Sequence, residues 1–157
     1  MIVLVMGVAG VGKTTIGEAL ADALGARFID ADDYHPPENV AKMKAGIPLQ
    51  DADRWPWLKR LNETLKDQPR AVLACSALKE AYRRRLSEGL QDFYIVYLHG
   101  TPELIRSRMQ ARRHRYMPDA LLDSQFATLE PPAGAIAIDV ATPLEESVAA
   151  LVAVLQQ

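Results

Sequence analysis

The sequence predicts an α/β fold in three layers, with a five-stranded parallel sheet between two layers of helices. Five short apolar segments alternate with segments of helical periodicity along the chain. Strands that alternate with helices in this way pair in parallel and are covered by helices on both faces. A glycine-rich loop also joins the first apolar segment to the first helical one. No repeat, low-complexity tract or linker interrupts the sequence, which predicts one domain over residues 1–157.

Composition limits the classes of function. The 157 residues are 49% hydrophobic and 24% charged, as is usual for a globular domain with one core. The net charge of −2 provides no general attraction to nucleic acid or membranes, and no apolar run approaches the ~20 residues of a membrane span. Cys75 is the only cysteine, so a reducing compartment is expected. Because the first strand begins at Ile2, we expect no targeting peptide and a cytoplasmic location.

The glycine-rich loop has the G-x-x-x-x-G-K-[ST] spacing of a phosphate-binding P-loop. An apolar strand precedes it, and apolar residues recur with helical spacing after it until Gly25. Glycines let successive backbone N–H groups point at a phosphate, and the helix N-terminus adds partial positive charge. Lys13 is expected to reach the β- and γ-phosphates, and Thr14 to ligate Mg²⁺. The expected ATP-binding residues of the loop are Gly7, Val8, Ala9, Gly10, Val11, Gly12, Lys13, Thr14 and Thr15. The predicted fold is therefore that of the P-loop NTPases.

The next helices and strands are predicted from helix-capping residues, helix-breaking residues and the spacing of apolar residues. A strand at 27–32 is expected to run into acidic residues, and a helix at 37–45 to bury Val40 and Met43. Asp51 or Asp53 is expected to cap the following helix, in which a proline lies in the first turn. A third strand at 71–75 precedes a helix that Ser76 is expected to cap and that runs to 89.

The second half of the chain continues the alternation. A fourth strand at 93–98 leads to a helix opened by Thr101, a proline and an acid. A further helix carries Leu122, Phe126 and Leu129 on one face and precedes a fifth strand at 135–140. Residues 142–145 have the pattern of a capping box, which predicts a last helix with Leu144 facing inward.

Two carboxylates are expected beside the P-loop. Asp30 and Asp32 end the second strand, and the carboxyl ends of parallel strands meet at one edge of a sheet, where ligands bind. One of them is suited to orient Mg²⁺ through water and the other to accept a proton from an attacking hydroxyl. The alternative is that both acids only cap the next helix.

Three residues are candidates for contacts to the second substrate: His35, Arg54 and Lys79. His35 is equally well explained as a turn histidine that packs on Pro36. Arg54 offers a rigid fork of donors to an anion, or is a surface residue near a helix start. Lys79 is expected in the first turn of the helix after the third strand. The run 83–85 is interpreted as a solvated face, with only Arg84 or Arg85 turned inward.

A basic segment near 112–118 is predicted to form a mobile lid. Arginines crowd the end of one helix and the break at Pro118, and arginines on a closing segment stabilise the charge of a phosphoryl transition state while water is excluded. Arg112 is the expected ATP contact, and Arg115 the expected catalytic one. The alternative is a salt-bridged helix exterior. The arginines of this cluster are Arg106, Arg108, Arg112, Arg113 and Arg115.

Beyond the P-loop, ordered blocks of sequence resemble the gluconokinase family. They are the blocks at 30–36 (Asp-Ala-Asp-Asp-Tyr-His-Pro), 46–49 (Gly-Ile-Pro-Leu), 53–58 (Asp-Arg-Trp-Pro-Trp-Leu), 75–79 (Cys-Ser-Ala-Leu-Lys) and 124–131 (Ser-Gln-Phe-Ala-Thr-Leu-Glu-Pro). The resemblance implies a shikimate-kinase-like P-loop fold. It also implies transfer of the ATP γ-phosphoryl group to the 6-hydroxyl of D-gluconate, with Mg²⁺ and commonly in a homodimer.

The resemblance assigns roles at matching positions only. It implies that Asp30 is the metal-side acid and Asp32 the base and a substrate contact, and that Arg54 and Lys79 lie near the sugar acid. The lid departs from the family pattern Arg-x-Gly-His-Phe, because His114 replaces the glycine and Arg115 the histidine. Two alternatives stay open: a kinase for another small hydroxy acid or sugar, such as shikimate, and a non-catalytic nucleotide-binding switch. A GTPase switch would need an Asn-Lys-x-Asp motif, which the sequence lacks.

Overall fold

The computed structural model describes residues 1–111 and 119–156, and it confirms the predicted α/β fold. All strand pairs are parallel, in the order β2-β3-β1-β4-β5. The strands are β1 (Ile2–Met6), β2 (Arg27–Asp30), β3 (Ala71–Ala74), β4 (Phe93–His99) and β5 (Ile136–Asp139). The central strand β1 carries the P-loop at its carboxyl end, so the loop opens at the middle of the sheet edge.

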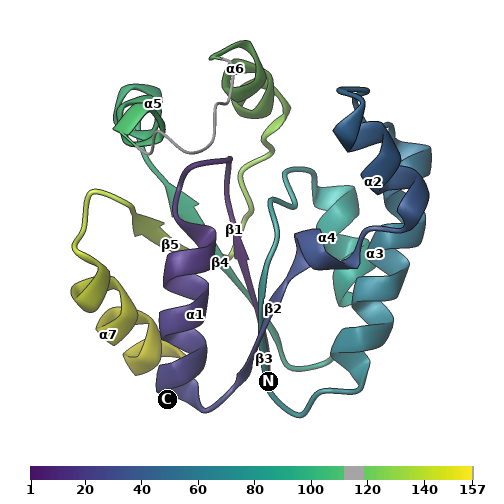
Figure 1. Ribbon diagram of the computed structural model, residues 1–157. Helices are drawn as coiled ribbons and strands as arrows, with labels where there is room; N and C mark the ends of the chain where they lie inside the picture. The colour runs from purple at the N-terminus through teal and green to yellow at the C-terminus, as the bar shows by residue number, and fades with distance from the viewer. Residues whose placement is uncertain (112–118, 157) are drawn as a thin grey trace.

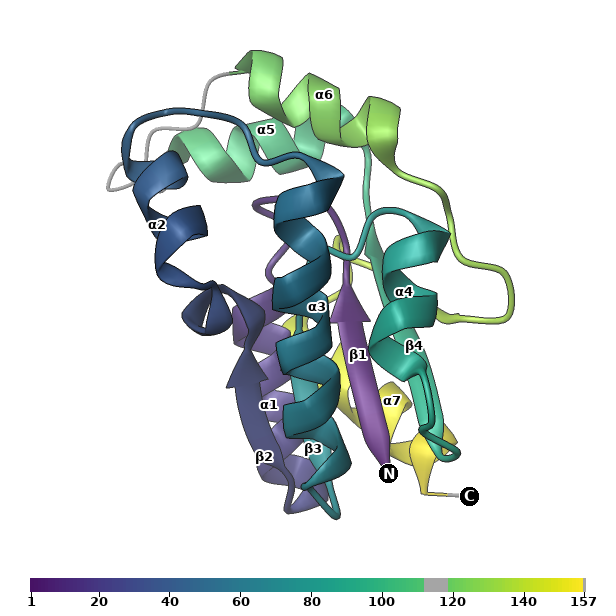
Figure 2. The ribbon, with the colours of Figure 1, turned by 90° about the vertical axis from the view of Figure 1, so that its right-hand side faces the viewer.

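Helices cover both faces of this sheet (Figure 1). They are α1 (Lys13–Leu24), α2 (Pro37–Lys44), α3 (Asp51–Lys66), α4 (Glu80–Ser87), α5 (Pro102–Ala111), α6 (Asp119–Thr128) and α7 (Leu144–Leu155), with a 3₁₀ turn η1 (Ala31–Tyr34) after β2. Helices α1 and α7 lie on one face and α3 and α4 on the other, while α5 and α6 cross the carboxyl edge of the sheet (Figures 1 and 2). No helix among the described residues is long and apolar enough to cross a membrane.

The sheet separates two apolar clusters because alternate side chains of each strand point to opposite faces. Val3 and Val5 of β1 pack toward α1, together with Leu20 and Leu151. Ile2, Leu4 and Met6 pack toward α3, together with Leu58 and Leu61. Every residue of β1 is buried, so the strand that carries the P-loop is fixed from both sides.

Several predicted caps and buried faces are wrong. In α2, Met43 is 44% exposed and Asn39 is buried instead, because the inward contacts of this helix are polar. The N-cap of α3 is Gln50, with Asp53 one turn inside. Helix α4 begins at Glu80, so Ser76 does not cap it.

At the other end of the chain one cap is confirmed and one is not. The Thr101 hydroxyl accepts a hydrogen bond from the Leu104 N–H of α5 at 3.2 Å. Pro143 is the N-cap of α7, which has no side-chain cap, and Leu144 is exposed rather than inward. The inward face of α7 is formed by Ser147 and Leu151.

Candidate active site

The P-loop (residues 7–14) leaves β1 and turns directly into α1. Gly7 has φ +154°, and a Cβ there would lie 2.7 Å from the Leu98 carbonyl oxygen of β4. Gly12 has φ +98° and is the N-cap of α1. A side chain would strain both positions. Glycine therefore allows the loop to pass close to β4 at Gly7 and to enter α1 through a left-handed conformation at Gly12.

Lys13 lies across the beginning of this loop. Its ammonium donates hydrogen bonds to the carbonyl oxygens of Gly7 and Val8, both at 3.0 Å. Burial lowers the pKa of Lys13, while the charges of Asp32 and Asp30 act in the opposite direction. The ammonium is therefore held at the start of the P-loop, between the loop and the two acids. Thr14 and Thr15 are exposed in the first turn of α1.

The structure brings Asp30 and Asp32 to the same edge as the P-loop. Asp30 ends β2, and its Oδ1 accepts a hydrogen bond from the Asp32 N–H at 3.0 Å. Burial raises the pKa of the Asp30 carboxyl, although this hydrogen bond opposes the shift. Asp32 is exposed in η1. The two carboxylates thus have different surroundings, one half-buried and bonded to the backbone and the other open to solvent.

His35 is buried in the turn after η1, and its ring packs on Trp57. The two rings are stacked, with centroids 4.2 Å apart and an angle of 16° between their planes. The Asn39 amide lies 3.2 Å from His35 Nδ1, and Trp57 Nε1 donates to the Ala31 carbonyl oxygen at 2.7 Å. Burial lowers the pKa of His35. The ring is therefore held mainly in its neutral form.

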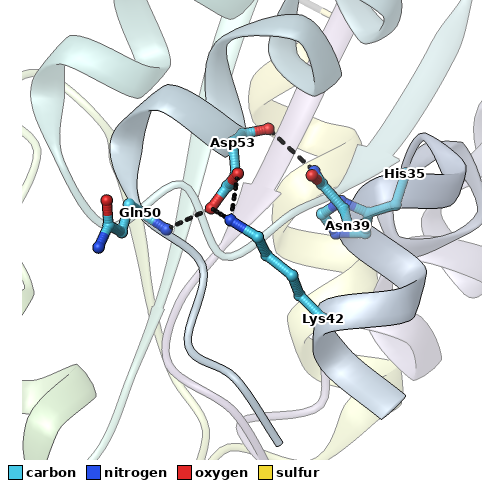
Figure 3. A network of polar contacts seen from close by, with 5 residues as sticks. All are labelled: His35, Asn39, Lys42, Gln50 and Asp53. Carbon is cyan, nitrogen blue, oxygen red and sulfur yellow. Dashed lines mark hydrogen bonds and ion pairs between the residues drawn. The ribbon is translucent and has the colours of Figure 1, made fainter. Parts of the chain in front are cut away.

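A polar network joins α2 to the start of α3 (Figure 3). Lys42 binds both oxygens of the Asp53 carboxylate, at 2.8 and 3.0 Å. The same carboxylate accepts from the Gln50 N–H at 2.9 Å, and Asn39 donates to the Asp53 carbonyl oxygen at 2.9 Å. The bonds from Lys42 and from the Gln50 N–H lower the pKa of Asp53. Asp53 therefore fixes the first turn of α3, which places Arg54.

Arg54 and Lys79 both lie close to one aromatic ring, that of Tyr82. The Arg54 guanidinium carbon is 5.5 Å from the centroid of the Tyr82 ring, and Lys79 Nζ is 5.8 Å from it. Arg54 also pairs with Asp51 at 3.2 Å, and the Tyr82 hydroxyl donates to the same carboxylate. Burial and this bond raise the pKa of Tyr82 to about 12. Two cations and a phenol thus meet where α3 and α4 begin, and the charges of Arg54 and Asp32 both act on the pKa of His35.

The turn that places Lys79 depends on Arg83. Arg83 is only 5% exposed, and it donates to the Ala77 and Glu130 carbonyl oxygens, each at 2.8 Å. Ala77 has a φ of +44°, which is rare for a residue with a Cβ. The prediction of a solvated run at 83–85 is wrong here, because the partners of Arg83 come from a tight turn and from a segment 47 residues away.

A pocket opens at the end of the P-loop that leads into α1. It is lined by Gly12 and Thr15 of the loop and α1, by Arg108 of α5, and by the segment from Val140 to Leu144. Arg108 entered the sequence analysis only as one member of a basic cluster. The segment before α7 showed only the pattern of a helix cap, so only the fold places it opposite Arg108.

Arg106 of that cluster pairs with Asp123 of α6 at 2.8 Å, as the salt-bridged alternative expects. Arg112, Arg113, His114 and Arg115 lie outside the described residues. The predicted lid near 112–118 therefore stays a prediction.

Comparison with known proteins agrees with this geometry. The shikimate kinase family model matches residues 9–126. The shikimate kinase of Bacteroides thetaiotaomicron has a TM-score of 0.73 at 18% identity, over 100% of this chain and 99% of that one, which shows the fold alone. Fold and site define a P-loop kinase, an ATP-using phosphotransferase.

Closer relatives give the family. A probable gluconokinase from Xenopus tropicalis is 46% identical over 89% of this chain and 85% of that protein. The thermosensitive gluconokinase of Escherichia coli K12 is 47% identical over 82% of this chain and 71% of that protein. A gluconokinase from Sinorhizobium meliloti 1021 superimposes with a TM-score of 0.90 at 46% identity, over 98% and 90% of the two chains. The chain belongs to the gluconokinase family.

Proposed function

We propose that this protein transfers the γ-phosphoryl group of ATP to the 6-hydroxyl of D-gluconate and releases 6-phospho-D-gluconate and ADP. The observation that carries the proposal is the pairing of two sites at one sheet edge. One is the P-loop with Lys13 beside Asp30 and Asp32, and the other is the cation pair of Arg54 and Lys79 around Tyr82. The names of relatives at 46–47% identity support gluconate as the acceptor.

On the phosphate side, Lys13 exchanges the Gly7 and Val8 carbonyls for phosphate oxygens when ATP binds. The Thr14 hydroxyl and the Asp30 carboxylate would hold Mg²⁺ beside the phosphates. In the described ranges no group of three or more His, Cys, Asp or Glu residues could hold a metal. A small donor set suits Mg²⁺, which keeps several waters and binds substrate phosphates. The ion, when bound, neutralises charge on the β- and γ-phosphates.

The nucleotide extends from the pocket beside Arg108 along the loop toward the Lys13 ammonium. The pocket formed by Arg108, Thr15 and residues 140–144 receives the base and ribose. The phosphates then lie over Gly12 to Thr15, and the γ-phosphate reaches the start of the loop, where the Lys13 ammonium lies.

On the acceptor side, Asp32 accepts the proton of the attacking hydroxyl, which its exposed position in η1 allows. Arg54 and Lys79 bind the sugar-acid carboxylate, because a guanidinium fork and an ammonium together match two carboxylate oxygens. His35, held neutral by burial, supplies a ring nitrogen to a sugar hydroxyl.

Four expectations from the sequence complete the proposal. Arg112 binds ATP and Arg115 stabilises the transferring phosphoryl group from a lid at 112–118. The protein forms a homodimer, as the resemblance implies, and it works in the cytoplasm, as its single cysteine suggests. Arg115→Ala should then lower kcat/KM for the sugar acid more than it weakens ATP binding, and Arg112→Ala should do the reverse.

The test is ADP release from Mg·ATP with a panel of acceptors: D-gluconate, shikimate, glucose and a nucleoside. We expect D-gluconate to accelerate turnover far more than the others. Equal or faster turnover with another member of the panel would reject gluconate as the acceptor, while the protein would still be a kinase. ATP binding without turnover on any acceptor would favour the nucleotide-binding switch.

A further inference from the structure

Gln125 of α6 makes a direct contact with the P-loop. Its side-chain oxygen Oε1 accepts a hydrogen bond from the Ala9 backbone N–H at 2.6 Å, across 116 residues of sequence. Ala9 is the third residue of the loop, and the Lys13 ammonium is bound to the carbonyls of the two residues before it. The contact therefore lies at the end of the loop that holds the Lys13 ammonium, away from the Arg108 pocket.

Helix α6 is anchored independently of this contact. Leu122 is 1% exposed and belongs to the same apolar cluster as Val8 and Val11 of the loop, and Phe126 packs against that cluster. The Arg106–Asp123 ion pair joins α6 to α5. Loss of the Gln125 amide should therefore leave α6 in place.

Helix α5 holds the next residue of the loop. A Cβ on Gly10 would lie 2.3 Å from Met109 Cγ, so the bare Gly10 backbone packs against that side chain. The first half of the P-loop is thus held from above by α5 and α6, the two helices that cross the sheet edge (Figure 2).

We propose that Gln125 is a positioning residue that fixes the γ-phosphate end of the P-loop through the Ala9 N–H. The 2.6 Å hydrogen bond to a loop residue beside the Lys13 contacts is the observation that carries this inference. A glutamine suits the place because it accepts the hydrogen bond with no negative charge that would repel the phosphates. This inference rests on the proposed function only where the kcat for gluconate is measured, because the two binding measurements need no acceptor.

The experiment measures dissociation constants for ADP and for a non-hydrolysable ATP analogue with Gln125→Ala and Gln125→Asn. Asparagine keeps the amide but ends about 1.5 Å short of the loop. For both variants we expect about tenfold weaker binding of the ATP analogue, the size expected for one lost hydrogen bond. ADP binding should change less than twofold, because its phosphates lie over Gly12 to Thr15. The kcat for gluconate should fall with the affinity for the analogue.

The matched control is Ser124→Ala, which removes a side chain at the neighbouring exposed position of α6. It should leave both affinities unchanged. Equal weakening of ADP and the analogue, together with a lower melting temperature, would overturn the proposal in favour of a structural role. Wild-type affinity of Gln125→Asn for the analogue would also overturn it. If the nucleotide affinities change as expected but the wild-type protein does not phosphorylate gluconate, the proposed acceptor is wrong and the positioning role of Gln125 stands.

Discussion

The phosphate end and the acceptor end of the site are built in different ways. The phosphate end is one continuous loop between a buried strand and a helix, and its apolar residues Val8 and Val11 are each 2% exposed. The acceptor end is assembled from η1, α2, α3 and the turn before α4, and its charged residues are held by hydrogen bonds rather than by apolar packing. The local sequence therefore determines the path of the phosphate-end loop, whereas contacts between distant segments determine the structure of the acceptor end.

The difference has a consequence for what a substitution does. The polar residues of the phosphate end, Lys13 and Thr14, are not part of the apolar core to which Val8 and Val11 belong, so removing one of them should change chemistry and leave stability nearly intact. Residues of the acceptor end support one another: Asp51 contacts both Arg54 and Tyr82. Changing one of them should also move its neighbours.

Asp32→Asn should have the largest effect, because it removes the proposed base at the point where the two ends meet. We expect kcat to fall by roughly 10²–10⁴-fold, the range for a general base, and ATP affinity to change little because the P-loop is intact. Single-turnover kinetics and ATP titration measure the two quantities. If ATP binding collapses and the bound complex turns over normally, Asp32 is the metal-side acid and Asp30 the base.

Lys13→Ala tests the independence of the phosphate end. The Lys13 ammonium donates hydrogen bonds to two loop carbonyls, so its loss should remove charge stabilisation of the transition state rather than packing. We expect kcat to fall by about 10²–10³-fold, with a melting temperature close to that of the wild type. A large loss of thermal stability would show that the loop is held together by this lysine, and the contrast between the two ends would then fail.

Prediction from the sequence is accurate for the strands and the P-loop, but not for the caps of α3, α4 and α7. The G-x-x-x-x-G-K-[ST] spacing, the five strands and the strand-end position of Asp30 follow from neighbouring residues, and the parallel sheet is as predicted. It failed where a partner is distant. Arg83 was assigned to a solvated face because its neighbours are charged, yet its partners are Ala77 and Glu130.

The same reason explains the residues that were missed. Tyr82 gave no signal because it contacts Asp51, 31 residues earlier. Gln125 was part of a recognised block, but nothing in the block indicated Ala9 as its partner. Met43 fitted an apolar helical face, and the polar network of α2 with α3 put Asn39 inside instead.

Arg54→Ala tests the acceptor end and should have a smaller effect than the two changes above. Loss of a charged hydrogen bond to the substrate corresponds to about a 10–100-fold rise in KM for the sugar acid. The KM for ATP should stay near the wild-type value. Arg54→Lys is the matched control: it keeps the charge but not the planar fork, so its KM should be intermediate. An equal rise in both KM values would place Arg54 at the nucleotide instead.

The smallest expected effect concerns His35, where the acceptor end is most closely packed. Burial against Trp57 lowers the pKa of His35 in the folded protein, so the unfolded chain takes up the proton first as the pH falls. The stability that the neutral ring contributes is complete above the unfolded pKa of about 6.5. It is lost as the pH falls from there toward the lowered folded pKa. His35→Gln cannot titrate, so its melting temperature should fall less than that of the wild type between pH 7.5 and 5.5. His99→Gln removes a histidine away from this stack, and it should keep the wild-type slope. A steeper fall for His35→Gln would mean that the folded protein binds the proton more tightly than the unfolded chain, and that the ring is not held neutral.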